Sequence, residues 1–223
     1  MTGSVGANHH SPVPAVKICG LTNLVDARHA WRAGADLLGF VLVPGTPRTI
    51  DPARAAAIVR ALRAEGCSAL MVGLFARESP AAVRAAVARC GFDLVQLHGD
   101  PPPAETAGLG APALIAWRVR DAMGSGPTID WASLVAYRAW GYVLDGYDPQ
   151  RLGGTGRTWN WGLAAERPEG LGRTLIAGGL TPDNVAEAIR LARPWGVDVS
   201  SGVELAPGHK DPEKVARFIE RAK

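Results

Sequence analysis

Apolar runs of strand length recur eight times along the chain, separated by stretches with the apolar spacing of helices. The runs are 15–19, 37–43, 69–75, 93–97, 113–119, 141–145, 173–177 and 197–200. Strands that alternate with helices form parallel sheets, because each helix carries the chain back to the starting edge of the sheet. Eight such units predict an α/β fold of the (β/α)8, or TIM barrel, type. A doubly wound sheet is the alternative, but its dinucleotide-binding form needs a GxGxxG motif that Cys19-Gly20-Leu21-Thr22 does not provide.

Helix signals flank these runs. Ala-rich segments with helical periodicity include 52–63, 80–89, 181–193 and 212–221, and several open with proline, which suits the first helical turn. Glycine marks the return to the strand at five positions: Gly34, Gly66, Gly91, Gly141 and Gly196. We expect these glycines to end helices in left-handed backbone, which glycine adopts without strain.

Length and composition bound the class of protein. No linker interrupts the repeat, so we expect a single domain over residues 15–223, preceded by a disordered leader over residues 1–14. Hydrophobic residues make up 47% and charged residues 20%, which is typical of a globular chain. Cys19, Cys67 and Cys90 show no CxxC spacing, so a disulfide framework and a zinc site are both disfavoured. A reducing, cytoplasmic setting fits best.

The charge pattern indicates the kind of partner. The net charge is +3, and the basic residues are spread along predicted helices without interleaved aromatic residues. We therefore expect an anionic small molecule rather than a nucleic acid.

Residues 1–14 lack the regions of a signal peptide, and no apolar run has the length of a membrane span.

The segment from Val16 to Cys19 places a lone thiol where the first strand gives way to a helix, the junction at which parallel α/β folds build active sites. Side chains alternate between the faces of a strand, so Lys17 and Cys19 share the face opposite to Val16 and Ile18. The ammonium of Lys17 should favour the thiolate, which would make Cys19 a base or a nucleophile. The alternative is a small buried hydrophobic residue.

The same parity turns other polar groups toward the barrel interior. They are Gln96, His98, Asp145, Asp198 and Ser200, and Arg48 follows in the second loop. Among them, Arg48 is a candidate anion clamp, His98 a polar contact and Asp145 an acid. The alternatives are a surface arginine for Arg48 and a structural histidine for His98.

Small residues gather in three loops that follow strands. Gly153-Gly154-Thr155-Gly156 comes after the sixth strand, Gly178 and Gly179 after the seventh, and Ser200, Ser201 and Gly202 after the eighth. Barrels often bind phosphate at the loops after strands seven and eight, so the sequence predicts a phosphate site here. The alternative is that glycine merely ends each strand.

Seven motifs occur in order between Val16 and the C-terminus. They are Lys17-Ile18-Cys19-Gly20, Thr46-Pro47-Arg48-Thr49-Ile50, Gln96-Leu97-His98-Gly99, Leu144-Asp145, Gly153-Gly154-Thr155-Gly156, Ser200-Ser201-Gly202-Val203-Glu204 and Gly208-His209-Lys210-Asp211. This ordered set resembles the phosphoribosylanthranilate isomerase family of tryptophan biosynthesis. The resemblance implies a (β/α)8 barrel, an Amadori rearrangement of a phosphosugar, and no metal or organic cofactor.

By the same resemblance, Cys19 matches the general base, Asp145 the general acid and Arg48 the residue near the anthranilate carboxylate. Our candidates for binding substrate are Lys17, Arg48, His98, Gly154, Gly178, Gly179, Asp198, Ser200, Ser201 and Gly202. We expect a monomer or a homodimer.

The chain departs from the family pattern at Arg157-Thr158-Trp159-Asn160-Trp161, where the family usually has lysine, then phenylalanine and aspartate before tryptophan. The larger Trp159 and the uncharged Asn160 are expected to reshape the sixth helix or the mouth of the site. Two other interpretations stay open. One is another phosphosugar isomerase or epimerase on the same barrel, which would not need Cys19 opposite Asp145. The other is a catalytically silent barrel that binds a pathway partner.

Overall fold

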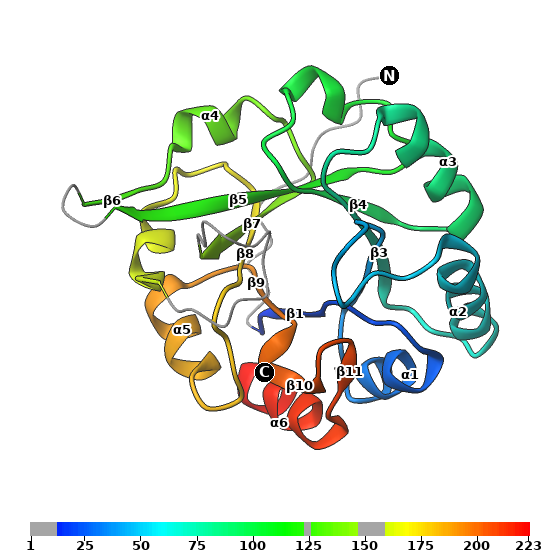
Figure 1. Ribbon diagram of the computed structural model, residues 1–223. Helices are drawn as coiled ribbons and strands as arrows, with labels where there is room; N and C mark the ends of the chain where they lie inside the picture. Colours follow the sequence, from blue (N-terminus) through cyan, green and yellow to red (C-terminus); the bar gives the residue numbers. More distant parts are fainter. Residues whose placement is uncertain (1–12, 123–125, 147–158) are drawn as a thin grey trace.

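The computed structural model describes residues 13–122, 126–146 and 159–223, and in them eight parallel strands close into a barrel (Figure 1). The strands are β1 (Ala15–Ile18), β2 (Leu37–Val41), β3 (Leu70–Phe75), β4 (Leu94–Leu97), β5 (Ala113–Ala122), β7 (Gly141–Gly146), β8 (Arg173–Ile176) and β9 (Gly196–Val199). Each pairs with the next, β4 pairs with β5, and β9 pairs with β1. The predicted (β/α)8 barrel is confirmed.

Helices surround the strands, although not every crossover has a long one. The α-helices are α1 (Leu24–Arg32), α2 (Pro52–Ala64), α3 (Pro80–Cys90), α4 (Trp131–Val135), α5 (Val185–Ala192) and α6 (Pro212–Ala222). Short 3₁₀ helices follow three of the strands: η1 (Pro103–Thr106) after β4, η2 (Trp161–Glu166) after β7 and η3 (Ser201–Val203) after β9. Strand β6 (Gly126–Thr128) pairs antiparallel with the end of β5, and β10 (Glu204–Ala206) forms a hairpin with β11 (His209–Lys210). Helix α5 begins four residues later than the periodicity predicts.

Capping residues fix where the helices begin. Asp51 accepts hydrogen bonds from the backbone N–H groups of Ala53 and Arg54, and Pro52 starts the first turn of α2. Ser79 before α3 and Asp211 before α6 act in the same way, each followed by proline.

The glycine prediction is correct at three positions and wrong at two. Gly34, Gly66 and Gly91 have φ of 104°, 84° and 73°, as expected for left-handed ends of helices. Gly141 and Gly196 instead begin β7 and β9. A Cβ atom there would lie 2.9 Å from the carbonyl oxygen of Arg173 and 2.6 Å from that of Ala15, so these glycines permit close strand packing.

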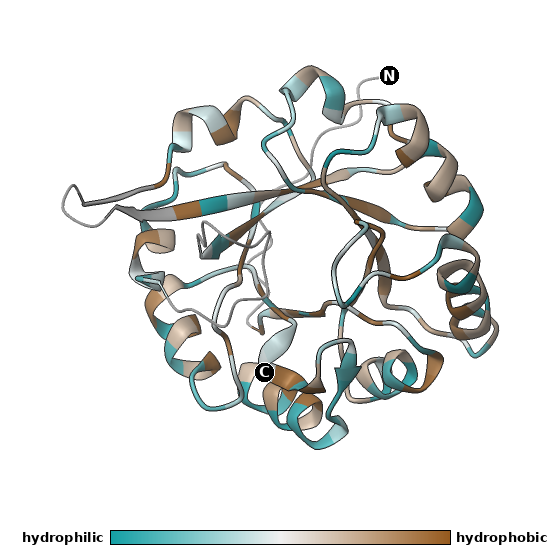
Figure 2. Ribbon diagram, in the orientation of Figure 1, coloured by the Kyte–Doolittle hydropathy of each residue, from teal (hydrophilic) through white to brown (hydrophobic). Residues whose placement is uncertain are grey.

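The barrel has an apolar layer on each side of its wall. Val16 and Ile18 belong to the large core between strands and helices, whereas Leu37 and Val72 face inward, and Figure 2 shows both hydrophilic and hydrophobic residues on the surrounding helices. Trp140 and Trp195, just before β7 and β9, pack edge to face with ring centroids 5.4 Å apart. Both rings pack against the inward-facing apolar residues of the barrel at the starting ends of the strands. No helix in the described residues is long and apolar enough to cross a membrane.

Candidate active site

A cavity of about 600 Å³, the mouth cavity, opens at the carboxyl ends of the strands. Ten of the twelve predicted site residues line it: Cys19, Arg48, His98, Asp145, Gly178, Gly179, Asp198, Ser200, Ser201 and Gly202. Lys17 lies beneath it, fully buried. Gly154, with the rest of residues 153–156, lies outside the described residues. The strand parity read from the sequence therefore brings the predicted polar groups together, as expected for side chains with a period of two.

Lys17 and Asp198 form a buried ion pair across the neighbouring strands β1 and β9. Nζ of Lys17 lies 3.0 Å from each carboxylate oxygen of Asp198. Burial lowers the pKa of Lys17, but the charges of Asp198 and Cys19 outweigh it, so the pKa lies above its usual value and the ammonium persists. The Lys17 ammonium, which the sequence pairs with the Cys19 thiol, is therefore already paired with the Asp198 carboxylate.

Cys19 is buried, with 7% of the residue exposed. Strand β2 leaves space for it, because a Cβ atom at Gly39 would lie 3.1 Å from Sγ of Cys19 and 3.2 Å from Nζ of Lys17. Burial raises the pKa of Cys19, and Asp198 raises it further, although Lys17 and Lys210 act to lower it. Lys17 thus favours the thiolate as expected, but desolvation and Asp198 outweigh the ammonium, so the pKa of Cys19 as a whole lies above its ordinary value.

Asp145 lies at the end of β7, close to the loop after β8. A Cβ atom at Gly178 would lie 2.9 Å from Oδ1 of Asp145, so glycine lets this loop pack directly on the carboxyl group. Burial raises the pKa of Asp145 to about 7, and the charge of Asp198 acts in the same direction. Asp145 is thus half protonated near neutrality, as a general acid requires.

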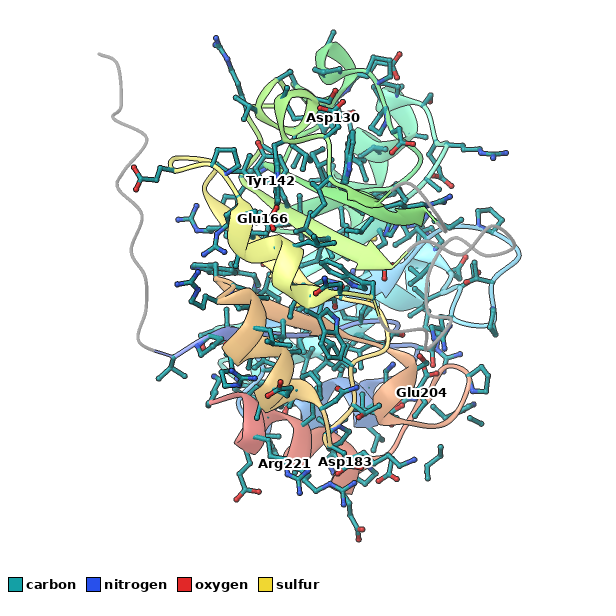
Figure 3. All side chains as sticks on the ribbon, turned by 90° about the vertical axis from the view of Figure 1, so that its left-hand side faces the viewer. Asp130, Tyr142, Glu166, Asp183, Glu204 and Arg221 are labelled. Carbon is teal, nitrogen blue, oxygen red and sulfur yellow. The ribbon has the colours of Figure 1, made fainter. Side chains whose placement is uncertain are left out.

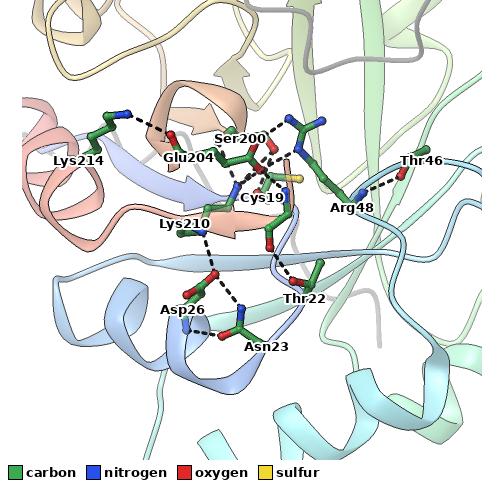
Figure 4. A network of polar contacts seen from close by, with 11 residues as sticks. Cys19, Thr22, Asn23, Asp26, Thr46, Arg48, Ser200, Glu204, Lys210 and Lys214 are labelled. Atoms are coloured by element: carbon green, nitrogen blue, oxygen red, sulfur yellow. Dashed lines mark hydrogen bonds and ion pairs between the residues drawn. The ribbon is translucent and has the colours of Figure 1, made fainter. Parts of the chain in front are cut away.

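Arg48 is held by a protein carboxylate (Figure 4). Its Nε and one terminal nitrogen donate to the two oxygens of Glu204 at 2.9 and 2.6 Å. Lys210 adds a third contact, with Nζ 2.8 Å from Oε1 of Glu204. The side view of Figure 3 shows Glu204 at the opposite end of the barrel from Tyr142, which lies near the start of β7. The Nε edge of the guanidinium is therefore occupied by Glu204, and its other edge is left for a ligand.

Lys210 is a site residue that the sequence reasoning missed. Its Nζ is buried and also donates to the carbonyl oxygen of Ser200 at 3.1 Å. Burial lowers the pKa of Lys210, against the opposing charge of Glu204. Both residues occur in the motifs of the family resemblance, but their pairing with Arg48, 156 residues away from Glu204, was not visible along the chain.

His98 contacts Gln96, its neighbour on the inward face of β4. Nε2 of the Gln96 amide lies 2.9 Å from Nε2 of the imidazole. Burial lowers the pKa of His98 to about 4, with Lys17 and Arg118 acting in the same direction. The imidazole is therefore neutral at physiological pH and cannot bind an anion by charge.

Backbone geometry fits the loops after β8 and β9 to a phosphate. Gly178 and Gly179 have φ of 83° and 68°, and a Cβ atom at Gly202 would overlap the carbonyl oxygen of Leu180. The two loops thus meet backbone to backbone. Within the described residues, the N–H groups of Gly179, Ser201 and Gly202 donate to no protein acceptor. Closely spaced N–H groups of this kind are suited to bind a phosphate oxygen.

Trp159, where the chain departs from the family pattern, packs in the hydrophobic core. The ring is buried, and its indole N–H donates to the carbonyl oxygen of Ala177 at 2.7 Å, directly before the Gly178 loop. Asn160 caps η2 by accepting a hydrogen bond from the N–H of Gly162. The tryptophan therefore supports the loop after β8, and the amide of Asn160 caps the turn without a charge. Arg157 and Thr158 lie outside the described residues.

Replacing Gly179 with aspartate is expected to raise KM about tenfold or more relative to asparagine, because the carboxylate would repel the phosphate across a few ångströms. Asparagine is the matched control, since both residues tolerate the positive φ of 68° at this position. KM values and inhibition constants of inorganic phosphate, measured for both variants, check this result. Equal KM values would place the phosphate elsewhere.

The family model described as N-(5'phosphoribosyl)anthranilate (PRA) isomerase matches residues 16–221. A relative from Pelobacter propionicus, named N-(5'-phosphoribosyl)anthranilate isomerase, is 46% identical over 208 residues, which are 93% of this chain and 95% of the relative. A relative of the same name from Trichlorobacter lovleyi is 47% identical over 208 residues, 93% of this chain and 97% of the relative.

Solved structures are similar over the same range. The phosphoribosyl anthranilate isomerase of Thermotoga maritima is 35% identical with a TM-score of 0.82, covering 94% of this chain and 98% of that one. The Thermus thermophilus enzyme is 36% identical with a TM-score of 0.81, covering 93% and 97%. A further isomerase structure, in complex with reduced 1-(o-carboxyphenylamino)-1-deoxyribulose 5-phosphate, is 32% identical with a TM-score of 0.77, covering 94% and 98%.

Proposed function

Because the chain belongs to the phosphoribosylanthranilate isomerase family, we propose that its mouth cavity catalyses that family's reaction with Cys19 as general base and Asp145 as general acid. The reaction is the Amadori rearrangement of N-(5-phosphoribosyl)anthranilate to 1-(2-carboxyphenylamino)-1-deoxyribulose 5-phosphate, a step of tryptophan biosynthesis. It is an aldose–ketose isomerisation, so hydrogen moves within one phosphosugar and acid–base groups are the chemistry required.

The first step opens the furanose ring. Asp145 gives its proton to the ring oxygen, and the bond from this oxygen to C1 breaks with its electrons going to oxygen. The nitrogen lone pair forms a double bond to C1, which yields a protonated Schiff base. A carboxyl group with an ordinary pKa would hold almost no proton at pH 7, so the raised pKa of about 7 supports this role.

The second step removes the proton from C2. Cys19 takes this proton, the C–H electron pair forms a double bond between C1 and C2, and the electrons of the Schiff base return to nitrogen. The resulting enolamine becomes the ketose when a proton leaves O2 and another is added to C1. The proton that Cys19 gains balances the one that Asp145 gives.

The thiolate of Cys19 must form in the occupied site, since burial favours the thiol in the resting enzyme. Lys17 and Lys210 both lower the pKa of Cys19 and so stabilise its charge. The proton transfer from Asp145 leaves a carboxylate and a cationic Schiff base in the cavity, so the net charge around Cys19 does not change, and the Schiff base helps only where it lies closer to the thiol than the carboxylate does.

The remaining contacts orient the substrate. The phosphate lies against the backbone N–H groups of Gly179, Ser201 and Gly202, and the anthranilate carboxylate lies on the outer edge of the Arg48 guanidinium. Glu204 holds the Nε edge of Arg48, which fixes the plane of the fork before the ligand arrives.

Replacing Arg48 with alanine is expected to raise KM about tenfold or more with a smaller change in kcat, because a carboxylate contact made equally in both states is lost mainly from KM. Lysine should restore only part of the loss, since it lacks the planar fork that Glu204 holds. Steady-state kinetics of both variants check this result. An unchanged KM in the alanine variant would leave Arg48 with a structural role on Glu204.

One observation carries the proposed roles: a carboxyl group with a pKa near 7 and a buried thiol line the same cavity from strands β7 and β1. The test follows anthranilate fluorescence while the purified protein consumes phosphoribosylanthranilate generated in the cuvette. A loss of fluorescence that requires the protein, and that disappears in both Cys19→Ser and Asp145→Asn, is expected. Full activity in either variant would overturn the assigned role of that residue.

A further inference from the structure

Gln96 takes no part in the acid–base steps of the proposed mechanism. We propose that it is a positioning residue whose amide fixes His98 as the tautomer protonated on Nδ1. In this tautomer His98 donates a hydrogen bond to an oxygen of the substrate's sugar chain. The inference rests on the proposed function of the mouth cavity, because Gln96 and His98 line that cavity together with Cys19 and Asp145.

The geometry of the pair sets the tautomer. Nε2 of Gln96 lies 2.9 Å from Nε2 of His98. An amide nitrogen carries two hydrogens and no lone pair to offer, so it can only donate. The imidazole nitrogen that faces it must then be an acceptor without a hydrogen. A neutral imidazole has a single N–H, which is left on Nδ1.

The charge state supports a neutral ring. Burial lowers the pKa of His98 to about 4, and the charges of Lys17 and Arg118 lower it too. The carboxyl groups of Asp145 and Asp198 line the same cavity, yet they do not reverse this direction. His98 is therefore a donor of one hydrogen bond near neutrality and a poor base.

Both partners leave one polar atom for a ligand. Gln96 is 1% exposed, and among the described residues its Oε1 has no hydrogen-bond partner. Nδ1 of His98 likewise makes no hydrogen bond to any residue that the structure describes. A buried amide oxygen without a partner is costly, so this one is poised to accept a hydroxyl group. A donor and an acceptor side by side match a sugar hydroxyl, which offers both.

The first test reads the tautomer in the ligand-free protein. The chain has five histidines, and a long-range ¹H–¹⁵N correlation on histidine-labelled protein separates the two neutral forms; the His98→Gln variant assigns the signal. We expect wild-type His98 to carry its hydrogen on Nδ1 and not to titrate between pH 5.5 and 8, about the range where an ordinary histidine would. A hydrogen on Nε2, or titration in that range, would overturn the proposal.

Substitutions at Gln96 separate positioning from packing. In Gln96→Glu the carboxylate can only accept, so the hydrogen should move to Nε2 or His98 should become charged, whereas Gln96→Met keeps the volume and removes the constraint. We expect kcat/KM to fall about tenfold in Gln96→Met and about a hundredfold in Gln96→Glu. The loss is larger in Gln96→Glu because the hydrogen moves to Nε2 and Nδ1 of His98 can then no longer donate to the substrate. Equal losses with an unchanged His98 tautomer in Gln96→Glu would mean packing alone and would contradict the proposal.

The ligand contact is tested with the reduced product analogue found in the solved isomerase complex. Saturating analogue should shift the Nδ1 proton of His98 downfield, while inorganic phosphate at saturation should leave it in place. No shift with bound analogue would overturn the contact. The tautomer is measured without substrate, so a failure here is distinguishable from a failure of the acid–base roles, which Cys19→Ser and Asp145→Asn test.

Discussion

Replacing Cys19 with serine is expected to lower kcat by about two to four orders of magnitude, the usual contribution of a general base. The hydroxyl group is nearly isosteric with the thiol, but it does not ionise near neutrality. The ion pair of Lys17 with Asp198 persists without the thiol, since it depends on contacts of 3.0 Å between those two side chains. The fold and the substrate affinity should therefore change little. Single-turnover kinetics and thermal unfolding of the variant check both expectations.

Cys90→Ser is the matched control. Cys90 is also buried, but its Sγ donates to the carbonyl oxygen of Pro52, outside the mouth cavity. A serine there can keep this hydrogen bond, so kcat should stay at the wild-type value. If Cys19→Ser kept most of the activity, the base would have to be another group. His98 would be a poor substitute, because its pKa lies at about 4 and its Nε2 already contacts Gln96.

Asparagine at Asp145 should lower kcat by a similar factor, about two to four orders of magnitude, and should also change the shape of the pH profile. In the wild type, burial raises the pKa of Asp145 to about 7 and raises that of Cys19 above its ordinary value. The base thus has the higher pKa, and the reactive form with a thiolate and a carboxylic acid is a minor species. Its population rises until the pH reaches about 7, stays level between the two pKa values and falls above the pKa of Cys19.

The wild-type kcat/KM should therefore follow a bell whose acid limb lies near pH 7 and whose alkaline limb lies above the ordinary thiol pKa. Without a titrating acid, the residual activity of Asp145→Asn should rise with the thiolate alone. Its acid limb should move to alkaline pH and its alkaline limb should vanish. Asp100→Asn, an exposed change in the loop after β4, should keep the wild-type bell. A bell that is unchanged in Asp145→Asn would assign both limbs to other groups.

The sequence by itself determined the barrel and the direction of its polar side chains. Eight apolar runs separated by helices admit few topologies, and the two-residue period of a strand sets which side chains face inward once one face is apolar. Lys17, Cys19, Asp145 and Asp198 could be placed at one mouth on this basis alone. The prediction that the loops after β8 and β9 bind phosphate came from their small residues and their position.

Only the tertiary structure decided how those groups interact. Cys19 and Lys17 are neighbours along the strand, but Asp198, which neutralises the ammonium, lies 181 residues away in sequence and adjacent in the barrel. Burial and the charge of Asp198 then raise the pKa of both Cys19 and Asp145. Glu204 likewise meets Arg48 only through the closed barrel. A pKa depends on desolvation and on charges within a few ångströms, and those distances exist only after strands far apart in sequence have paired.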